Sequence, residues 1–356
     1  MSSFILALNP GSTSTKIGVF KDEEMLFEHT LRYSAEELKG FANIYSQYEF
    51  RLEDIQAFLR EENFDLNLLT AVVGRGGLLK PIAGGTYQVN EAMLKDLREG
   101  YSGDHASNLG GLLAHAFAQD LNIPAYIVDP TVVDELEEVA RYSGLPMISR
   151  RSIQHTLNQK MVAHSCALEL EQSYQESNFI VAHLGGGISV SAHKKGRIID
   201  SNNALDGDGP FSPERAGGLP VCDVITMAYS GEYSQAELRK LFVGRGGLIA
   251  YLDSNDGREI TQRIEQGDQK AKIVFEAMAY QVAKEIGAQA VVLEGQIDAI
   301  ILTGGLAYSQ YLISYIERKI GFLGRVFVYP GEDELLALAL GVLRVLKGAE
   351  QVKVYV

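Results

Sequence analysis

The sequence lacks tryptophan and has only two cysteines, Cys166 and Cys222, which are isolated and form no CxxC motif. This pattern predicts a cytoplasmic protein with reduced, buried thiols. No apolar run approaches the roughly 18 residues of a membrane helix, and residues 4–8 are too short and lack the charged leader of a signal peptide. We therefore expect no membrane segment and no secretory signal.

Basic residues are also scarce. The chain has 32 Lys and Arg against 46 Asp and Glu, which gives a formal net charge of −14. A protein that binds the backbone of nucleic acids needs a basic surface, so the charge argues against a nucleic-acid partner, although a local basic pocket for a small anion is compatible with it. The remaining composition, 46% hydrophobic and 22% charged over 356 residues, is that of a globular chain long enough for two domains.

Alternating apolar segments predict an α/β chain whose two halves repeat one order, hairpin strands followed by helices and further strands. Residues 144–149 are the candidate hinge, because a glycine and a proline interrupt the pattern there. Strands are expected at 4–8, 15–20, 25–33, 70–73, 125–128, 179–183, 188–193, 197–200, 298–302 and 325–328. Helices are expected at 34–61, 90–99, 108–121, 131–142, 153–172, 220–229, 234–241, 268–289, 308–320 and 333–347.

The strands at 4–8 and 179–183 each run into a glycine-containing turn and a second strand, so both read as β-hairpins. Glycine allows close backbone approach to a phosphate, and the N–H groups of residues 11–14 could point at one. Solvated or tightly packed turns are the alternatives. The chain has neither a P-loop nor a GxGxxG motif. The candidate phosphate ligands are Asn9, Ser12, Thr13, Ser14 and Lys16 at the first tip, and His183, Gly185, Gly186 and Gly187 at the second.

Two arginines are flanked by glycines, Arg75 in Gly-Arg-Gly-Gly and Arg215 in Arg-Ala-Gly-Gly. Such flanks leave a guanidinium room to bind a carboxylate or phosphate with two hydrogen bonds, although a flexible surface arginine is the alternative for each. Asp129 ends a strand before a proline, as active-site residues or strand-end caps do. Among seven histidines, His155 and His183 are the most interesting, and the absence of zinc-like spacing predicts no zinc site.

Two further segments carry potential ligands. Gly304 and Gly305 follow an expected strand and could cradle an adenine or ribose. Glu332 and Glu334 precede the last helix, where acidic residues either cap the helix or hold Mg²⁺ through water. Asn9 offers a carbonyl oxygen suited to the same ion.

Over its full length the chain resembles the butyrate kinases of the acetokinase family, within the superfamily of acetate and sugar kinases, heat-shock chaperones and actin. The segment 209–217 is the part most specific to butyrate-type kinases. The resemblance is carried by residues 9–16, 72–77, 104–110, 127–130, 183–187, 209–217 and 302–305.

The resemblance implies two duplicated ribonuclease-H-like domains with a cleft between them, formed by residues 1–148 with 333–356 and by residues 149–332. It implies reversible phosphoryl transfer from ATP to butyrate or a related short or branched-chain carboxylate, giving acyl phosphate and ADP with Mg²⁺ as cofactor. An acetate kinase, or an ATP-driven conformational switch without a small acceptor, is the alternative. The resemblance also implies a homodimer or a higher homo-oligomer.

Site residues follow from the same resemblance. Asn9, Ser12 and Ser14 match a first phosphate motif, residues 183–187 a second, and Gly304-Gly305 an adenosine motif. Two departures affect the nucleotide site: Gly186 replaces an asparagine of acetate kinases, and Ala307-Tyr308 replaces a Glu-Asn pair. The expected catalytic residues are Arg75, Asp129, His155 and Arg215, with His105 as a fifth.

Overall fold

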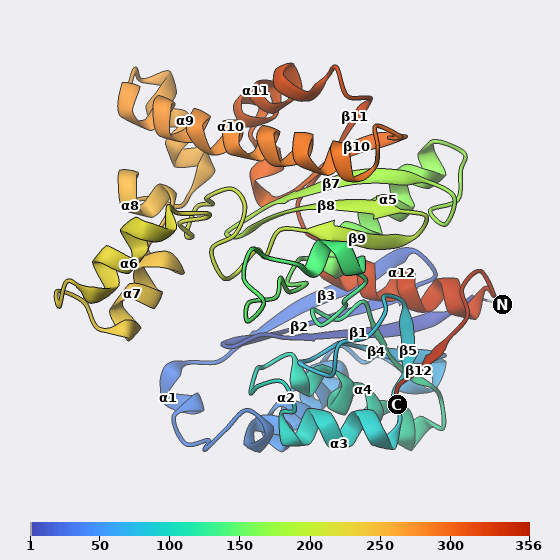
Figure 1. Ribbon diagram of the computed structural model, residues 1–356. Coiled ribbons are helices and arrows are strands. Elements are labelled where there is room, and N and C mark those ends of the chain that lie inside the picture. The colour runs from blue at the N-terminus through green and yellow to red at the C-terminus, as the bar shows by residue number, and fades with distance from the viewer. Residues whose placement is uncertain (1) are drawn as a thin grey trace. The chain divides into compact units, whose positions relative to one another are not determined.

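The computed structural model describes residues 2–356 of a mixed α/β protein with two separate sheets (Figure 1). The chain divides into two compact units, Met1–Val133 with Asp333–Val356 and Asp134–Glu332. The domain boundary at residue 148 stays a prediction. Within residues 2–356 no helix is long and apolar enough to cross a bilayer.

The first unit is built on a seven-stranded sheet in the order β12-β5-β6-β4-β1-β2-β3. β1 and β2 form the predicted hairpin, β3 extends it, and β4 and β6 run parallel to β1. The strands are β1 (Phe4–Pro10), β2 (Ser14–Lys21), β3 (Glu24–Arg32), β4 (Ala71–Arg75), β5 (Thr86–Gln88), β6 (Ala125–Val128) and β12 (Lys353–Val354).

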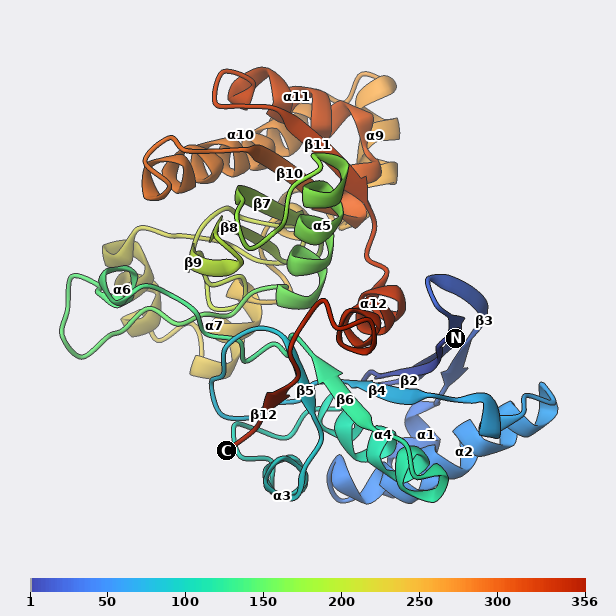
Figure 2. The same cartoon turned by 90° about the vertical axis from the view of Figure 1, so that its right-hand side faces the viewer.

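Helices cover both faces of this sheet. Figure 2 shows α12 on one face and α4 on the other, and the apolar side of α12 packs on β1, β4 and β6. α12 is rich in Leu and Val, and the burial of its apolar side chains anchors the C-terminal segment to the first unit. The helices of the unit are α1 (Ala35–Leu38), α2 (Tyr48–Glu61), α3 (Glu91–Glu99), α4 (Asn108–Leu121) and α12 (Glu334–Leu346).

The second unit has a five-stranded sheet in the order β11-β10-β7-β8-β9, with the second predicted hairpin formed by β7 and β8. Its strands are β7 (Asn178–Leu184), β8 (Ile188–Lys194), β9 (Arg197–Ser201), β10 (Ala299–Gly304) and β11 (Val326–Pro330). Its helices are α5 (Thr156–Glu169), α6 (Val221–Tyr229), α7 (Gln235–Phe242), α8 (Leu248–Leu252), α9 (Gly257–Glu265), α10 (Gln269–Val292) and α11 (Gln310–Ile320).

The two faces of this sheet carry different helices. Ile180 and Ala182 belong to the core cluster that contains α10, whereas Phe179 and Val181 belong to the cluster that contains α5. Successive side chains of a strand point to opposite faces, so α10 and α5 cover opposite faces of the sheet (Figure 2). Every second residue of β7 and of β8 therefore faces α5.

The helix expected at 131–142 is wrong. Residues 131–137 form a turn and irregular backbone, and a short 3₁₀ turn follows at Glu138–Arg141. The Glu137 N–H donates to Ile199 O at 2.9 Å, and the buried Glu135 carboxylate accepts from a backbone N–H of β9. The segment is therefore held by the edge strand β9, and its backbone groups are not available for helical hydrogen bonds.

Other expectations need smaller corrections. The helix expected at 34–61 is interrupted after α1, and α2 begins at Tyr48 after a 3₁₀ turn. The sequence patterns did not indicate β5, β12, α8 or α9. Cys166 is buried as expected, but Cys222 is exposed, because α6 buries none of its side chains.

Candidate functional site

The tip of the β1–β2 hairpin is held from behind by Arg51 of α2. Its side chain is fully buried, and its guanidinium donates to Gly11 O at 2.8 Å, Ser14 O at 3.1 Å and Ser12 O at 3.2 Å. Gln47 Oε1 accepts a further bond at 2.8 Å. Burial lowers the pKa of Arg51, but an arginine stays charged at neutral pH. A fixed positive charge therefore lies directly beneath this tip.

Sequence reasoning missed Arg51, although a signal was present. Arg51 lies three residues after Tyr48 and four before Ile55, at the spacing of the apolar positions of the expected helix. A charged residue on the apolar face of a helix needs internal partners. The partners here are carbonyl groups of the hairpin.

The hairpin tip presents hydroxyls and one ammonium to solvent. Ser12, Thr13 and Lys16 are exposed and Ser14 is half-buried. The Gly11 N–H donates to Ser14 O at 2.7 Å, so the expectation that it points at a phosphate is wrong. The tip therefore offers side-chain donors rather than a complete cradle of backbone N–H groups.

Asn9, Arg75 and Glu334 form one cluster at the ends of β1 and β4 and the start of α12. Asn9 Nδ2 donates to Glu334 Oε2 at 2.5 Å, and Arg75 Nη1 pairs with Glu334 Oε1. Arg75 Nη1 also lies 3.5 Å from Asn9 Oδ1. Of the two glutamates expected near Mg²⁺, Glu334 is therefore the one beside Asn9.

The cluster of Asn9, Arg75 and Glu334 contains oxygen atoms of the kind that bind Mg²⁺. Within residues 2–356 no group of three or more His, Cys, Asp or Glu side chains is arranged to hold a metal ion. A Mg²⁺ ion that is bound mainly by substrate phosphates and water needs only one or two protein oxygens. The Asn9 amide oxygen and the Glu334 carboxylate are such a donor set.

Two other predicted residues of the first unit lie in defined environments. His105 Nδ1 is 2.8 Å from Ser107 Oγ, and partial burial followed by the charge of Arg75 lowers the pKa of His105. Asp129 is buried with a φ of 40°, and its carboxylate accepts from the Gly85 N–H at 2.7 Å. The Asp129 carboxylate is thus held at the end of β6, and its predicted catalytic role stays a prediction.

In the second unit His155 and His183 stack face to face. Their ring centroids are 3.7 Å apart and the ring planes differ by 11°. His183 Nδ1 lies 2.7 Å from Asn158 Oδ1, and Nε2 lies 2.9 Å from Glu332 Oε1. The structure therefore brings together two predicted histidines and one predicted glutamate at the end of β7.

Arg215 lies across the glycine turn between β7 and β8. Its Nη1 donates to Ala204 O, and a Cβ atom added to Gly187 would overlap this nitrogen. Only glycine leaves room for the guanidinium here. The structure thus places the predicted Arg215 against the predicted second hairpin.

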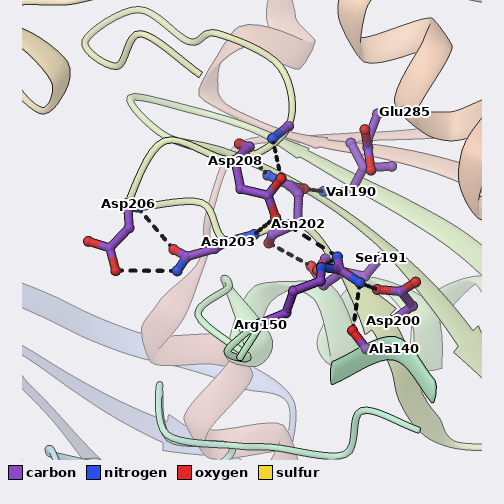
Figure 3. A network of polar contacts seen from close by, with 12 residues as sticks. Ala140, Arg150, Val190, Ser191, Asp200, Asn202, Asn203, Asp206, Asp208 and Glu285 are labelled. Atoms are coloured by element: carbon purple, nitrogen blue, oxygen red, sulfur yellow. Dashed lines mark hydrogen bonds and ion pairs between the residues drawn. The ribbon is translucent and has the colours of Figure 1, made fainter. Parts of the chain in front are cut away.

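A polar network around Arg150 and Asn202 fixes the segment that follows β9 (Figure 3), and Ala204, which accepts from Arg215, belongs to this segment. Arg150 Nη1 lies 2.9 Å from Asp200 Oδ1 and donates to Ala140 O at 2.8 Å. Asn202 Oδ1 accepts from a backbone N–H of β8 at 2.7 Å, and Ala204 N–H donates to Ile153 O at 2.9 Å. These contacts of Asn202 and Ala204 hold the Ala204 carbonyl, which accepts from Arg215, in place.

A cavity of about 1380 Å³ opens beside the same turn. Glycines of three segments that are far apart in the sequence line it, Gly185 and Gly186 from the hairpin, Gly257 at the start of α9 and Gly305 after β10. Gly304 precedes Gly305 with a φ of +90°, which favours glycine. The opposite wall comes from residues 255–262 and 308–311, and α9, which supplies most of the first stretch, was not expected from the sequence.

The two departures noted in the sequence both fall in this cavity. A Cβ atom at Gly186 would lie 3.6 Å from Glu214 Oε2, and Glu214 Oε1 accepts from Asn255 Nδ2 at 2.7 Å. An amide and a carboxylate therefore face the position where Gly186 lacks a side chain. Tyr308 lines the cavity and is 70% exposed, so its ring is available to a ligand.

Comparisons with known proteins agree on one family. Residues 140–326 match the model of the acetokinase family. The chain is 53% identical to butyrate kinase 2 of Clostridium acetobutylicum over 351 residues, 99% of each chain. It is 52% identical to a probable butyrate kinase of Clostridium botulinum over 355 residues, 100% of each chain.

Among solved structures, acetate kinase of Porphyromonas gingivalis is similar with a TM-score of 0.79 at 19% identity, over 97% of this chain and 100% of the other. This similarity shows a shared fold. The actin-like α/β fold class expected from the sequence is confirmed.

Replacing Arg51 with methionine is expected to loosen the first hairpin. The loss of hydrogen bonds to three carbonyls should lower the free energy of unfolding by about 2–4 kcal/mol. Urea unfolding measures this change, and hydrogen exchange at residues 11–15 should become faster. Arg60→Met, on the exposed side of the same helix, is the control and should change stability by less than about 0.5 kcal/mol. Equal effects of the two substitutions would contradict the bracing role of Arg51.

Proposed function

Because this chain belongs to the acetokinase family, we propose that it is an ATP:carboxylate phosphotransferase of the butyrate kinase type. It transfers the γ-phosphoryl group of ATP reversibly to butyrate or a related short or branched-chain carboxylate, and the products are an acyl phosphate and ADP. This proposal rests on one observation: the chain is more than 50% identical in sequence to butyrate kinases over its whole length. Acetate kinase is not favoured, since the acetate kinase found is similar only in fold.

We assign ATP and ADP to the cavity of the second unit. Gly185, Gly186 and Gly187 allow nucleotide phosphates to approach the backbone, and Gly304 and Gly305 take the adenosine. The convergence of these two glycine segments on one cavity of about 1380 Å³ supports the assignment. Tyr308 is the ring available for the base to stack on.

The chemistry needs charge neutralisation more than a base. A short-chain carboxylic acid has a pKa near that of a glutamate side chain, about 4–5, so it is already ionised at neutral pH. The difficulty is that one anion attacks another, and positioned cationic donors lower that barrier. Arg75 and Arg215 are proposed to hold the carboxylate and the phosphoryl group, and His155 donates to the phosphoryl oxygens.

The other predicted site residues have supporting roles. Ser12, Thr13, Ser14 and Lys16 are proposed to bind phosphate oxygens at the first hairpin. His183 is proposed to lie close to the transferred phosphoryl group, and His105 is proposed as a further catalytic residue. Asp129 is proposed as an orienting carboxylate rather than a base, because it already accepts from Gly85.

Mg²⁺ is proposed as the cofactor, with Asn9 Oδ1 and Glu334 as the protein oxygens that hold it, directly or through water. Such an ion neutralises charge on the nucleotide phosphates. Glu332 was the other predicted ligand, and it contacts His183, whereas Glu334 is the glutamate that contacts Asn9. A cytoplasmic location stays a prediction, which the two unpaired cysteines support.

An ATP-dependent hydroxamate assay tests the function. Wild-type protein given ATP, Mg²⁺, hydroxylamine and a series of acids should form acyl hydroxamate. The kcat/KM for butyrate should exceed that for acetate by about tenfold or more, since each buried methylene is worth 1–3 kcal/mol. A preference for acetate would favour acetate kinase, and ATP hydrolysis without hydroxamate would favour the conformational switch.

Arg215 can be tested directly and through its neighbour. Arg215→Ala should lower kcat by about 10²–10³-fold while ATP still binds, because a donor to the transferred group is lost. Gly187→Ala should have a similar effect, since its Cβ atom displaces the same guanidinium. Gly186→Ala places its Cβ atom at ordinary contact distance and should cost distinctly less. Near-normal turnover in Arg215→Ala would show that Arg215 is not a catalytic residue.

The family resemblance also predicts a homodimer or a higher homo-oligomer. In support, α6 exposes apolar side chains, among them Val221, Ile225 and Tyr229. Light scattering on the purified chain should give at least twice the mass of 39.0 kDa, and Ile225→Asp should lower it if α6 lies in the contact. A wild-type mass of one chain would refute the prediction.

A further inference from the structure

The face of β8 that packs against α5 is polar and yet completely buried. Ser189, Ser191 and His193 alternate along β8 and each is 0% exposed. Val181 and Phe179, the cross-strand partners of Ser191 and His193, belong to the cluster that contains α5, so this is the α5 face. Buried polar side chains need internal partners, so this seam must be hydrogen-bonded.

Four hydrogen bonds join the seam into one chain that ends at the predicted catalytic histidine. Tyr174 Oη lies 2.8 Å from His193 Nδ1, and His193 Nε2 lies 3.0 Å from Gln159 Oε1. Gln159 Nε2 donates to Ser189 Oγ at 2.7 Å. Ser189 Oγ lies 2.8 Å from His155 Nδ1.

The amide of Gln159 fixes the direction of this chain. An amide oxygen only accepts and an amide nitrogen only donates, so His193 must donate from Nε2. Burial, followed by the nearby charge of Lys160 and by His164, lowers the pKa of His193 well below its usual value, and the ring is neutral. Its Nδ1 then accepts from the Tyr174 hydroxyl.

The same reasoning continues toward His155. Ser189 Oγ receives the Gln159 N–H, so its own proton is available for His155 Nδ1. We propose that this chain of Tyr174, His193, Gln159 and Ser189 holds His155 as the neutral tautomer with its proton on Nε2. The four residues are thus positioning residues for the proposed function, in which His155 donates its Nε2–H to the transferred phosphoryl group.

A doubly protonated His155 does not suit these contacts. Its Nδ1–H would donate to Ser189 Oγ, and the serine proton would then lose its acceptor. The ring of His155 also lies face to face with the ring of His183. Two positive rings stacked at 3.7 Å would repel each other.

Imidazole ¹⁵N NMR on the full-length protein reads the tautomer without any turnover. His155→Gln assigns the His155 signals by their disappearance. Wild-type protein should show His155 protonated at Nε2 and unprotonated at Nδ1. Ser189→Ala should convert His155 to a mixture of tautomers and lower kcat by about 10–100-fold with the KM for ATP nearly unchanged.

Ser191→Ala is the matched control. Ser191 lies on the same strand and face with the same burial, but it hydrogen-bonds to Gln154 and Ser201. It should leave both the His155 signals and kcat unchanged. Gln159→Glu keeps the side-chain size but can only accept from Ser189, so it should draw the serine proton away from His155 and reproduce the effect of Ser189→Ala.

Two outcomes overturn the inference: wild-type His155 protonated at Nδ1, or equal effects of Ser189→Ala and Ser191→Ala. If Gln159→Glu does not fold, the comparison of Ser189→Ala with Ser191→Ala still tests the inference. A wild-type protein that forms no acyl phosphate would refute the proposed function, while the NMR result would still decide the tautomer.

Discussion

The stacking of His155 on His183 is the contact on which the described site of the second unit depends. It ties the first turn of α5 to the last residues of β7, immediately before the glycine turn that makes room for Arg215. A ring pair at this separation tolerates little displacement, because the hydrogen bonds at the ring nitrogens fix both planes. The stacked pair therefore fixes the end of β7 beside the glycine turn against which Arg215 lies.

Two arginine side chains are hydrogen-bonded to neutral backbone carbonyls. Arg51 and Arg215 both donate to backbone carbonyls, and burial lowers the pKa of each without discharging it. A carboxylate partner would cancel the field of a guanidinium, whereas carbonyl groups leave much of it for a ligand. For a reaction between two anions in a chain with a net charge of −14, this arrangement is useful, because it concentrates positive potential locally.

Much of the fold could be predicted from the sequence, because hairpins and amphipathic helices have short-range patterns. Both β-hairpins, the central strands and the family were predicted, and the structure and comparisons confirm them. The helix at 131–142 failed because a tertiary bond to Ile199 outweighs its local pattern. Arg51 and the buried seam of β8 were missed because partners distant in the sequence give them their roles. The separate roles of Glu332 and Glu334 needed coordinates, since they differ by two positions but contact His183 and Arg75 respectively.

The central claim is that this chain moves a phosphoryl group between a nucleotide and a short-chain carboxylate. ³¹P NMR of the reverse reaction tests it most directly, with purified protein, ADP, Mg²⁺ and butyryl phosphate. The account predicts that the acyl phosphate signal falls while the γ-phosphate signal of ATP rises in equal amount. Loss of acyl phosphate to inorganic phosphate alone, or no change with any short-chain acyl phosphate, would contradict it.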